Sequence, residues 1–310
     1  MSFNDSVLIC DEVYPILNKI LGDNGLKVSY EPTITSEEIL EKISNFNIII
    51  VRSRTTVTKE MIEKADNCKI IARVGVGLDN IDQDAAKEKN IRVINAVEGA
   101  MNAVAELVLG LMLSLARQTG RGDRAIRNGQ WLKKELKGTE LRGKYLGIIG
   151  LGNIGKRLGR LARALNMNII GYDVVPIDEE FSKEVGLMKA DLNTLLQSSD
   201  FISIHVPLLD STYHLLDAQK MSTMKKTAKI INTSRGGVVD EDALYDAIKN
   251  GNLGGAALDV FEKEPAIGTK LAELDNVILT PHIGAQTKEA QSLAANVIAE
   301  KIIQILRGVI

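Results

Sequence analysis

Hydrophobic residues fall into short runs that alternate with amphipathic stretches along almost the whole chain. In the first third, β-branched runs predict strands at 7–10, 27–30, 47–51, 69–73 and 91–94. Between them, helical spacing and N-terminal Ser, Thr or Asp caps predict helices at 36–44, 58–65 and 82–89. Strict alternation of strand and helix is typical of a parallel sheet covered by helices on both faces.

A second series of the same kind begins near residue 145. It predicts strands at 145–150, 168–173, 201–205, 228–232, 254–258 and 277–280. We therefore expect two α/β units. A helix at about 102–117 is expected to connect them, and a helix at about 287–306 is expected to return to the first.

Composition narrows the possible partners. The chain has 310 residues, 45% of them hydrophobic and 25% charged, as expected of a soluble protein with about two domains. A net charge of -2 provides no basic field for nucleic acid or an anionic membrane. The most apolar segment, 103–116, is too short to cross a bilayer comfortably and is interpreted as a buried helix.

The cysteines and the first residues of the chain bear on metal binding and on localisation. The two cysteines form no CxxC pair and have no metal-ligand spacing, so we expect neither a disulfide framework nor a metal. The first residues show no basic segment followed by an apolar stretch. We therefore expect no signal peptide and a cytoplasmic protein.

Residues 150–155 read Gly-Leu-Gly-Asn-Ile-Gly, with a predicted strand before them and a helix at 156–165 after them. In this context Gly150 permits a tight turn, Gly152 lets the backbone approach a pyrophosphate, and Gly155 allows close packing of helix and strand. The amides of Asn153 and Ile154 would lie at the helix N-terminus, which favours an anion. The alternative is a glycine turn in an α/β fold that binds no coenzyme.

The choice of coenzyme is predicted from Asp173, which ends the next predicted strand 23 residues after Gly150. A carboxylate at this point would accept hydrogen bonds from ribose hydroxyls and repel a 2′-phosphate. Because no arginine follows at 174–176, NAD is favoured over NADP.

Five motifs in order then resemble the D-isomer-specific 2-hydroxyacid dehydrogenases and, within that family, the D-3-phosphoglycerate dehydrogenases most closely. These motifs lie at 75–82, 150–155, 232–237, 257–265 and 281–285. The resemblance implies an NAD-dependent oxidation of D-3-phosphoglycerate, in serine biosynthesis. It also implies a Rossmann-type coenzyme domain at 98–285, inserted into a flavodoxin-like substrate domain formed by 1–97 and 286–310.

The family resemblance further implies a homodimer formed through the coenzyme domain, using the long helix and the segment that contains Trp131. Because the chain ends soon after its last predicted helix, we expect a short form without a C-terminal regulatory domain. L-serine is accordingly expected not to inhibit it.

The resemblance identifies Arg235, Glu264 and His282 as the catalytic set. An imidazole at 282 would exchange the proton of the hydroxyl group, and Glu264 would orient it and favour its charged form. The guanidinium of Arg235 would bind the substrate carboxylate. Further coenzyme contacts are expected from His205, Pro207, Thr233 and Asp259. His214, the remaining histidine, has no evident partner and is interpreted as structural.

Substrate residues are expected after two predicted strands, because ligands of parallel sheets bind at the carboxyl ends of strands. By resemblance, Arg52 binds the phosphate and Lys133 reaches in from a partner subunit. Arg54 departs from the family pattern, in which a small residue is common, and its role is left open. The full set of expected substrate residues is Arg52, Ser53, Arg73, Val74, Gly75, Val76, Asn102 and Lys133.

Three other functions are considered. A glyoxylate or hydroxypyruvate reductase, or another D-2-hydroxyacid dehydrogenase, would use the same chemistry on a substrate without phosphate. An NAD-sensing corepressor would use the same fold to bind protein partners. A methyltransferase with an adenosyl cofactor would share the glycine-rich turn but would not explain Arg235, Glu264 and His282.

Overall fold

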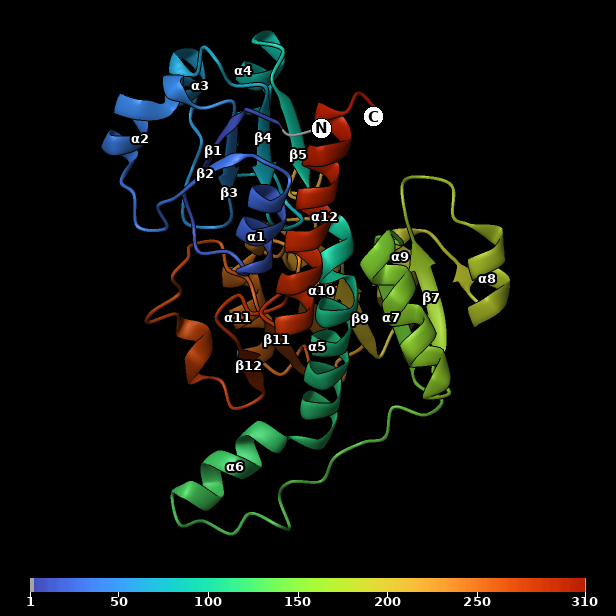
Figure 1. The fold of residues 1–310 in the computed structure, drawn as a ribbon. Coiled ribbons are helices and arrows are strands. Elements are labelled where there is room, and N and C mark those ends of the chain that lie inside the picture. Colours follow the sequence, from blue (N-terminus) through green and yellow to red (C-terminus); the bar gives the residue numbers. More distant parts are fainter. Residues whose placement is uncertain (1–2, 310) are drawn as a thin grey trace. The chain divides into compact units, whose positions relative to one another are not determined.

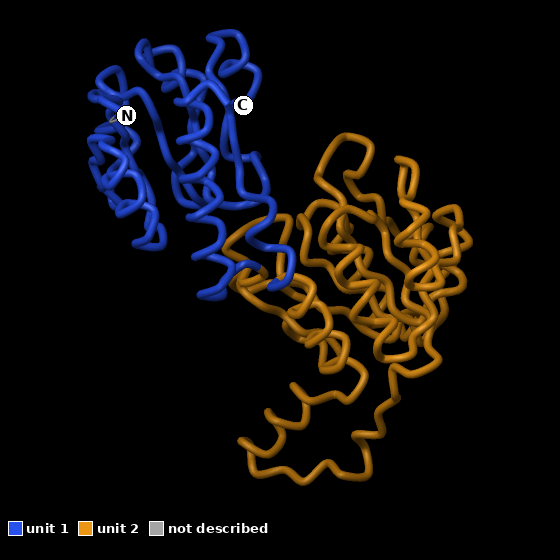
Figure 2. The backbone as a smooth tube through the Cα atoms, turned by 45° about the vertical axis from the view of Figure 1, so that its right-hand side comes forward, with its two compact units in different colours: residues 1–103, 285–310 blue, residues 104–284 orange. Residues whose placement is uncertain are grey.

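Two parallel sheets form from the two series of β-branched runs, one in each of two units of the chain (Figures 1 and 2). The structure is a computed structural model, and it describes residues 3–309. Unit 1 comprises the residues up to 103 together with those from 285 onward, and unit 2 comprises 104–284. The sequence-based domain limits were 97/98 and 285/286. Helix α5 (Val97–Arg117) crosses the first unit boundary and so contributes to both units.

Unit 1 contains a five-stranded sheet in the order β2-β1-β3-β4-β5, all parallel, which is the flavodoxin-like arrangement. Strand β3 is buried at all four positions because helices cover both faces of the sheet. Its elements are β1 (Ser6–Ile9), α1 (Ile16–Asp23), β2 (Lys27–Tyr30), α2 (Ser36–Lys42), η1 (Ile43–Asn45), β3 (Ile48–Val51), α3 (Lys59–Lys64), β4 (Ile70–Arg73), α4 (Gln83–Glu88), β5 (Arg92–Asn95), the start of α5 and α12 (Lys288–Leu306).

Alternate side chains of these strands point to different helices. Ile48 and Ile50 pack with α1 and α12 on one face, and Ile49 and Val51 pack with α2, α3 and α4 on the other. The N-cap of α2 is Thr35, whose side chain and backbone form a reciprocal capping box with Glu38. Apart from the start of α5, the predicted strands and helices of this unit are present to within one or two residues, and helix α1 was not predicted.

Unit 2 contains a seven-stranded parallel sheet in the order β12-β11-β10-β9-β6-β7-β8, a Rossmann-type doubly wound fold. Its elements are most of α5, then α6 (Thr119–Arg127), β6 (Tyr145–Ile149), α7 (Asn153–Ala164), β7 (Asn168–Tyr172), α8 (Glu179–Val185), β8 (Met188–Lys189), α9 (Leu192–Ser198), β9 (Phe201–Ile204), α10 (Ala218–Ser222), β10 (Lys229–Asn232), η2 (Gly236–Val238), α11 (Glu241–Lys249), β11 (Gly255–Leu258), η3 (Lys270–Glu273) and β12 (Val277–Leu279).

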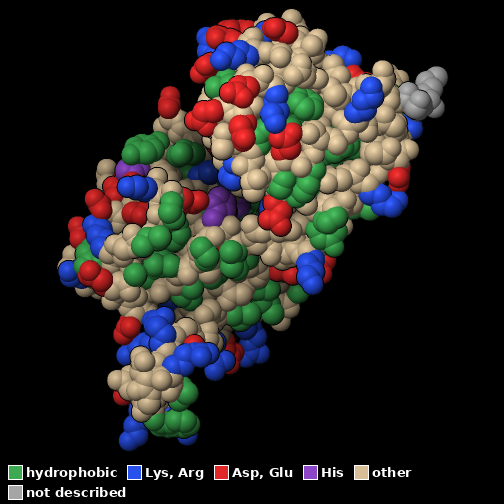
Figure 3. Space-filling view, turned by 60° about the vertical axis from the view of Figure 1, so that its left-hand side comes forward, with side chains coloured by type: hydrophobic (Ala, Val, Ile, Leu, Met, Phe, Trp, Pro, Cys, Tyr) green, Lys and Arg blue, Asp and Glu red, His purple; other side chains and the backbone are tan. Residues whose placement is uncertain are grey.

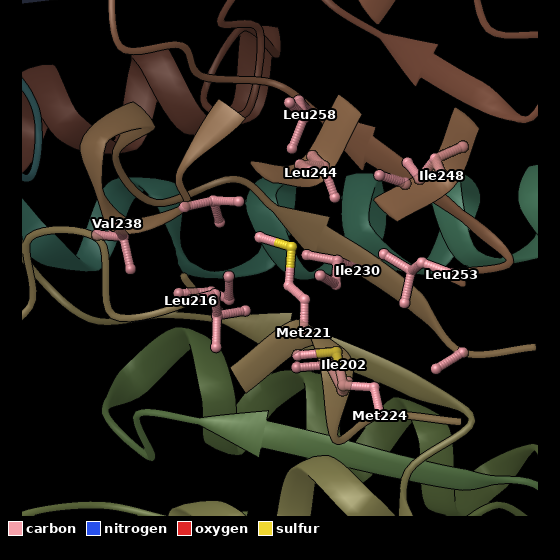
Figure 4. Packing of buried hydrophobic residues seen from close by; sticks show 14 of the residues in the cluster. Ile202, Leu216, Met221, Met224, Ile230, Val238, Leu244, Ile248, Leu253 and Leu258 are labelled. Atoms are coloured by element: carbon pink, nitrogen blue, oxygen red, sulfur yellow. The ribbon is translucent and has the colours of Figure 1, made fainter. Parts of the chain in front are cut away.

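The core of unit 2 fixes the strands whose ends carry the polar loops. Figure 4 shows Ile202 of β9 and Ile230 of β10 packed with Met221 of α10 and Leu244 of α11. All four side chains are almost completely buried. By contrast, α6 and the segment 128–140 extend away from the rest of this unit (Figure 2).

Helix α5 begins at Val97, five residues earlier than predicted, and is 21 residues long. Among the described residues, it is the one helix long and apolar enough to cross a membrane by length and composition. The prediction that this segment is too short to span a bilayer was therefore wrong. Half of its most apolar window is buried inside the protein, with Ala105, Val108 and Met112 fully covered. This burial is typical of a core helix.

Candidate active site

The glycine turn of unit 2 follows β6 directly. Gly150 has a φ of 91°, and a Cβ there would lie 2.6 Å from the carbonyl oxygen of His205. A Cβ on Gly155 would lie 2.1 Å from the carbonyl oxygen of Gly150. Gly152, the N-cap of α7, has open space around its Cβ position and no side-chain cap. The first amides of α7, from Asn153 onward, are thus accessible to an anion.

Asp173 follows β7 and lies against this turn. Its Oδ2 accepts a hydrogen bond from the amide of Leu151 at 2.6 Å, and its Oδ1 accepts one from Val175 at 3.2 Å. The spacing in the sequence thus correctly placed a carboxylate beside the glycine turn. Its remaining lone pairs can accept hydrogen bonds from ribose hydroxyls.

The loops after β9 and β10 carry further polar groups, and that after β9 contacts the glycine turn through His205. The Nε2 of His205 is 2.9 Å from the Oγ of Ser203, and burial lowers the pKa of His205 to about 4, so the ring is neutral at pH 7. The carbonyl of Pro207 accepts a hydrogen bond from Thr212 at 2.6 Å. The Oγ1 of Thr233 is buried and has no hydrogen-bond partner among the described residues. A buried hydroxyl without a partner is suited to hydrogen-bond a polar group of a bound dinucleotide.

His282 and Glu264 form a direct pair in unit 2. The Nδ1 of His282 is 2.8 Å from the Oε2 of Glu264, whose Oε1 accepts a hydrogen bond from the amide of Phe261 at 3.2 Å. Engagement of Nδ1 leaves Nε2 as the ring nitrogen for a substrate. The pair lines a pocket of about 550 Å³, whose other lining residues are Phe261, Pro265, Ala266, Ile267, Thr269, Leu279, Thr280 and Pro281.

The backbone of His282 is itself held in an uncommon conformation. Its φ of 53° lies in the left-handed region, which costs of order 1 kcal/mol for a residue with a side chain. Asp259, only 1% exposed, holds this loop: its carboxylate accepts hydrogen bonds from Thr280 Oγ1 at 2.6 Å and from the amides of Ile283 and Gly284 at 2.8 Å each. The predicted coenzyme contact of Asp259 remains a prediction, whereas its role in placing His282 was missed.

Arg235 lies in the turn after β10. The fully buried Asn232 donates to the carbonyl of Arg235 at 2.7 Å and accepts from the amide of Ser234 at 3.0 Å. A Cβ on Gly236 would lie 1.9 Å from the carbonyl carbon of Phe261. The glycine therefore lets the Arg235 turn pack directly against the segment that carries Glu264.

His214 has a partner that the sequence did not reveal. Its Nε2 is 3.0 Å from the Oε1 of Glu262, and its ring stacks on Tyr213 at 4.0 Å. The same Oε1 accepts the amide of Glu241 at 3.1 Å. His214 therefore ties its loop to the segment that leads to Glu264, which agrees with a structural role.

In unit 1, four hydrogen bonds fix Arg52, which follows β3. Its amide donates to Asp11 Oδ2 at 2.5 Å, and its guanidinium donates to Gln286 Oε1 at 3.0 Å. Its carbonyl accepts from Arg73 Nε at 3.0 Å and from Asn80 Nδ2 at 3.3 Å. Asp11 and Asn80 thus position the predicted phosphate-binding loop, and neither was predicted.

The structure brings some of the predicted substrate residues together. Arg52, Val74 and Gly75 line one small pocket of about 30 Å³ in unit 1. Ser53 and Asn102 are exposed and Val76 is half-buried, and these three are not part of that lining. Lys133 is exposed on the extended segment of unit 2.

The side chain of Arg54, whose role was left open, makes its hydrogen bonds to other residues of unit 1. Its Nη1 donates to the carbonyl of Ile34 at 2.9 Å, its Nη2 donates to the carbonyl of Cys10, and its Nε is 3.3 Å from Asp11 Oδ1. These contacts join three segments of unit 1. These contacts indicate a structural role for Arg54, because Asp11 also accepts the hydrogen bond from the amide of Arg52.

Comparison with known proteins identifies the relatives of this chain. Residues 109–284 match the profile of the D-isomer specific 2-hydroxyacid dehydrogenase NAD-binding domain. The chain is 46% identical over 303 residues to D-3-phosphoglycerate dehydrogenase of Methanocaldococcus jannaschii, covering 97% of this chain and 57% of that protein. It is also 46% identical over 290 residues to hydroxypyruvate reductase of Thermotoga maritima, covering 93% of each.

A solved structure shows the same fold. The holo form of D-mandelate dehydrogenase from Rhodotorula graminis has a TM-score of 0.91 and 30% identity, covering 98% of this chain and 94% of that one. The chain thus spans little more than half the length of the archaeal phosphoglycerate dehydrogenase, but almost the full length of the reductase. The match to the NAD-binding domain, these identities and the geometry around Arg235, Glu264 and His282 place the chain in the D-isomer-specific 2-hydroxyacid dehydrogenase family.

Proposed function

We propose that this protein is an NAD-dependent dehydrogenase that interconverts D-3-phosphoglycerate and 3-phosphohydroxypyruvate. The observation that carries the choice of substrate is Arg52, a guanidinium held at the carboxyl end of β3 by contacts that leave several of its N–H groups free. Planar guanidinium groups suit phosphate oxygens because they can donate two hydrogen bonds at once.

The chemistry follows from the residues of unit 2. In the oxidation, the Nε2 of neutral His282 takes the proton of the C2 hydroxyl, and the imidazolium that forms is stabilised by Glu264, 2.8 Å from Nδ1. Arg235 holds the carboxylate next to C2. Bound NAD supplies the acceptor for the hydride that leaves C2. In the reverse direction the imidazolium returns its proton to the carbonyl oxygen.

Coenzyme binding is assigned to the glycine turn and its surroundings. Gly152, with open space at its Cβ position, lets the backbone approach a pyrophosphate, and Gly150 and Gly155, whose Cβ positions lie close to backbone atoms, keep the turn tight. Asp173 is proposed to bind the adenosine ribose, and the buried hydroxyl of Thr233 is proposed to bond the coenzyme. We assign the coenzyme role to unit 2 and the recognition of the phosphate to unit 1.

A hydroxypyruvate reductase is the second candidate, because the Thermotoga maritima protein of that name is equally identical and matches over 93% of its length. Its substrate carries no phosphate and needs no guanidinium at position 52. A coupled assay with NADH across 3-phosphohydroxypyruvate, hydroxypyruvate, glyoxylate and pyruvate separates the candidates. We expect the highest kcat/KM with 3-phosphohydroxypyruvate, and a higher value with hydroxypyruvate would replace the proposal with the reductase.

The protein is further proposed to be a cytoplasmic homodimer. On the extended segment of unit 2, Trp131 is 78% exposed and Ile126 is 57% exposed. Exposed large apolar side chains on a projecting segment favour contact with a second copy, which would also let Lys133 of one chain approach the substrate of its partner. Sedimentation analysis of the Trp131→Ser variant tests this: we expect a shift from dimer to monomer, and an unchanged mass would exclude the segment as the interface.

A further inference from the structure

Unit 2 also contains a cavity of about 410 Å³, lined by many charged side chains, that the proposed reaction does not use. It lies at the amino ends of the strands, where Lys229 begins β10 and Asn276 precedes β12. The glycine turn, Arg235 and His282 follow the carboxyl ends of β6, β10 and β12. The cavity is therefore at the opposite edge of the same sheet, and its volume is within the range of small-molecule sites.

The cavity carries an excess of positive charge. Five cationic and two anionic side chains line it: Arg121, Arg124, Lys137, Lys144, Lys229, Asp200 and Asp275. Both carboxylates are already engaged. Asp275 is 3.5 Å from Arg121 and 3.7 Å from Arg124, and Asp200 is 3.0 Å from Lys225, which is not part of the lining.

The three lysines of the lining have no such partner. Within residues 3–309, no carboxylate oxygen lies within 4 Å of the Nζ of Lys137, Lys144 or Lys229. Lys229 is half-buried, with its Nζ 3.3 Å from the carbonyl of Thr227. Burial lowers the pKa of its amine; among the nearby charges, Asp200 raises this pKa and Lys144 lowers it. The charged form of a half-buried amine that makes no direct ion pair is stabilised further when an anion binds beside it.

The sequence around the cavity also has an excess of positively charged residues. Residues 117–144 contain nine Lys or Arg and three Asp or Glu, in a chain whose net charge is -2. Lys and Arg side chains gather on the surface around α6 and the segment after it (Figure 3). This stretch therefore has a net charge of +6, whereas the rest of the chain has a net charge of -8.

We propose that this cavity binds a small phosphate compound with two or more negative charges, at a site separate from those for coenzyme and substrate. The guanidinium groups of Arg121 and Arg124 donate to phosphate oxygens in the fork geometry, and Lys144 and Lys229 supply point charges. A ligand here contacts the first residues of β9, β10 and β12, whose other ends lead to the groups of the active site. This proposal does not depend on which 2-hydroxy acid is the substrate.

Inorganic pyrophosphate is the probe. It is titrated by calorimetry into the full-length protein saturated with NADH, so that the coenzyme site is filled. We expect saturable binding of one pyrophosphate per chain that weakens as NaCl is raised. Lys144→Gln should weaken the binding at least about tenfold, because one charge-assisted contact is lost. Asp275→Asn should tighten it, because both arginines lose their competing carboxylate.

Two controls separate this site from other sources of binding. Lys183→Gln removes an exposed lysine of α8 far from the lining in sequence and should bind pyrophosphate like the wild type. Arg52→Ala removes the proposed substrate phosphate site and should also leave this binding unchanged. The proposal is overturned by the absence of saturable binding to the wild type, by wild-type affinity in Lys144→Gln, or by loss of binding in Arg52→Ala.

Discussion

Replacing Arg52 with alanine separates the two candidate substrates. The loop does not depend on the guanidinium for its conformation, because the backbone of Arg52 is held by Asp11, Arg73 and Asn80. Among residues 3–309, the side chain hydrogen-bonds only to Gln286. The change should therefore remove the contact with phosphate and leave the loop in place.

The size of the effect follows from that contact. A hydrogen bond to a charged group contributes ~1.5–3 kcal/mol, and ~1.4 kcal/mol corresponds to a factor of ten. We expect Arg52→Ala to lower kcat/KM for 3-phosphohydroxypyruvate by roughly 10- to 150-fold. With hydroxypyruvate, which lacks the phosphate, kcat/KM should remain close to that of the wild type. The assay is initial-rate oxidation of NADH with each substrate.

Arg54 offers a matched control two residues away. Its guanidinium is bound to Ile34, Cys10 and Asp11, so Arg54→Ala should lower the melting temperature and reduce activity with both substrates in the same proportion. The comparison distinguishes a loss of phosphate binding, which affects one substrate, from a loss of stability, which affects both. Equal losses with both substrates in Arg52→Ala would refute the phosphate role, and no loss with either would make Arg52 a surface charge.

Three further predictions concern unit 2. His282→Ala should abolish most turnover and leave NADH binding, measured by fluorescence titration, near normal; restored activity at high pH would argue against proton transfer by this ring. Asp173→Ser removes the carboxylate beside the glycine turn, so kcat/KM should fall with NADH and rise with NADPH, and unchanged ratios would exclude Asp173 from coenzyme choice. Burial lowers the pKa of His205 from 6.5 to about 4. As the pH falls through that range, His205 therefore becomes protonated in the unfolded chain but stays neutral in the folded protein. The free energy of unfolding should therefore fall by up to about 3 kcal/mol at the acid limit, and His205→Asn should lessen this dependence in urea titrations at pH 7 and pH 4.5.

The parts of this fold that could be predicted from the sequence are those encoded by neighbouring residues. The strands of both sheets appear as β-branched runs, and the glycine turn and Asp173 are separated by one strand and one helix, so their approach follows from the fold. Strand β8 has two residues and α10 has five, too few for a periodic pattern. Those elements form because the sheet and the core beneath them are already in place.

The residues that position the site were missed for a related reason. Asp11 lies 41 residues from Arg52, and Glu262 lies 48 residues from His214. A buried aspartate such as Asp259 resembles any loop carboxylate until three donors are seen around it. The family motifs indicated which side chains are proposed to react, whereas the side chains that hold them are identified by contacts between distant parts of the chain.

Helix α12 also determines when unit 1 can be completed during synthesis. Helices α1 and α12 together cover one face of its sheet, and α12 buries Ala295, Ile298, Ala299 and Ile302 against strands made at least some 200 residues earlier. All strands of unit 2 lie between these two parts of the chain. Domains usually fold in the order in which they leave the ribosome. Unit 1 is translated first, so the part of its apolar face that α12 covers stays exposed until unit 2 has been translated, and the growing chain is most prone to aggregate during that interval.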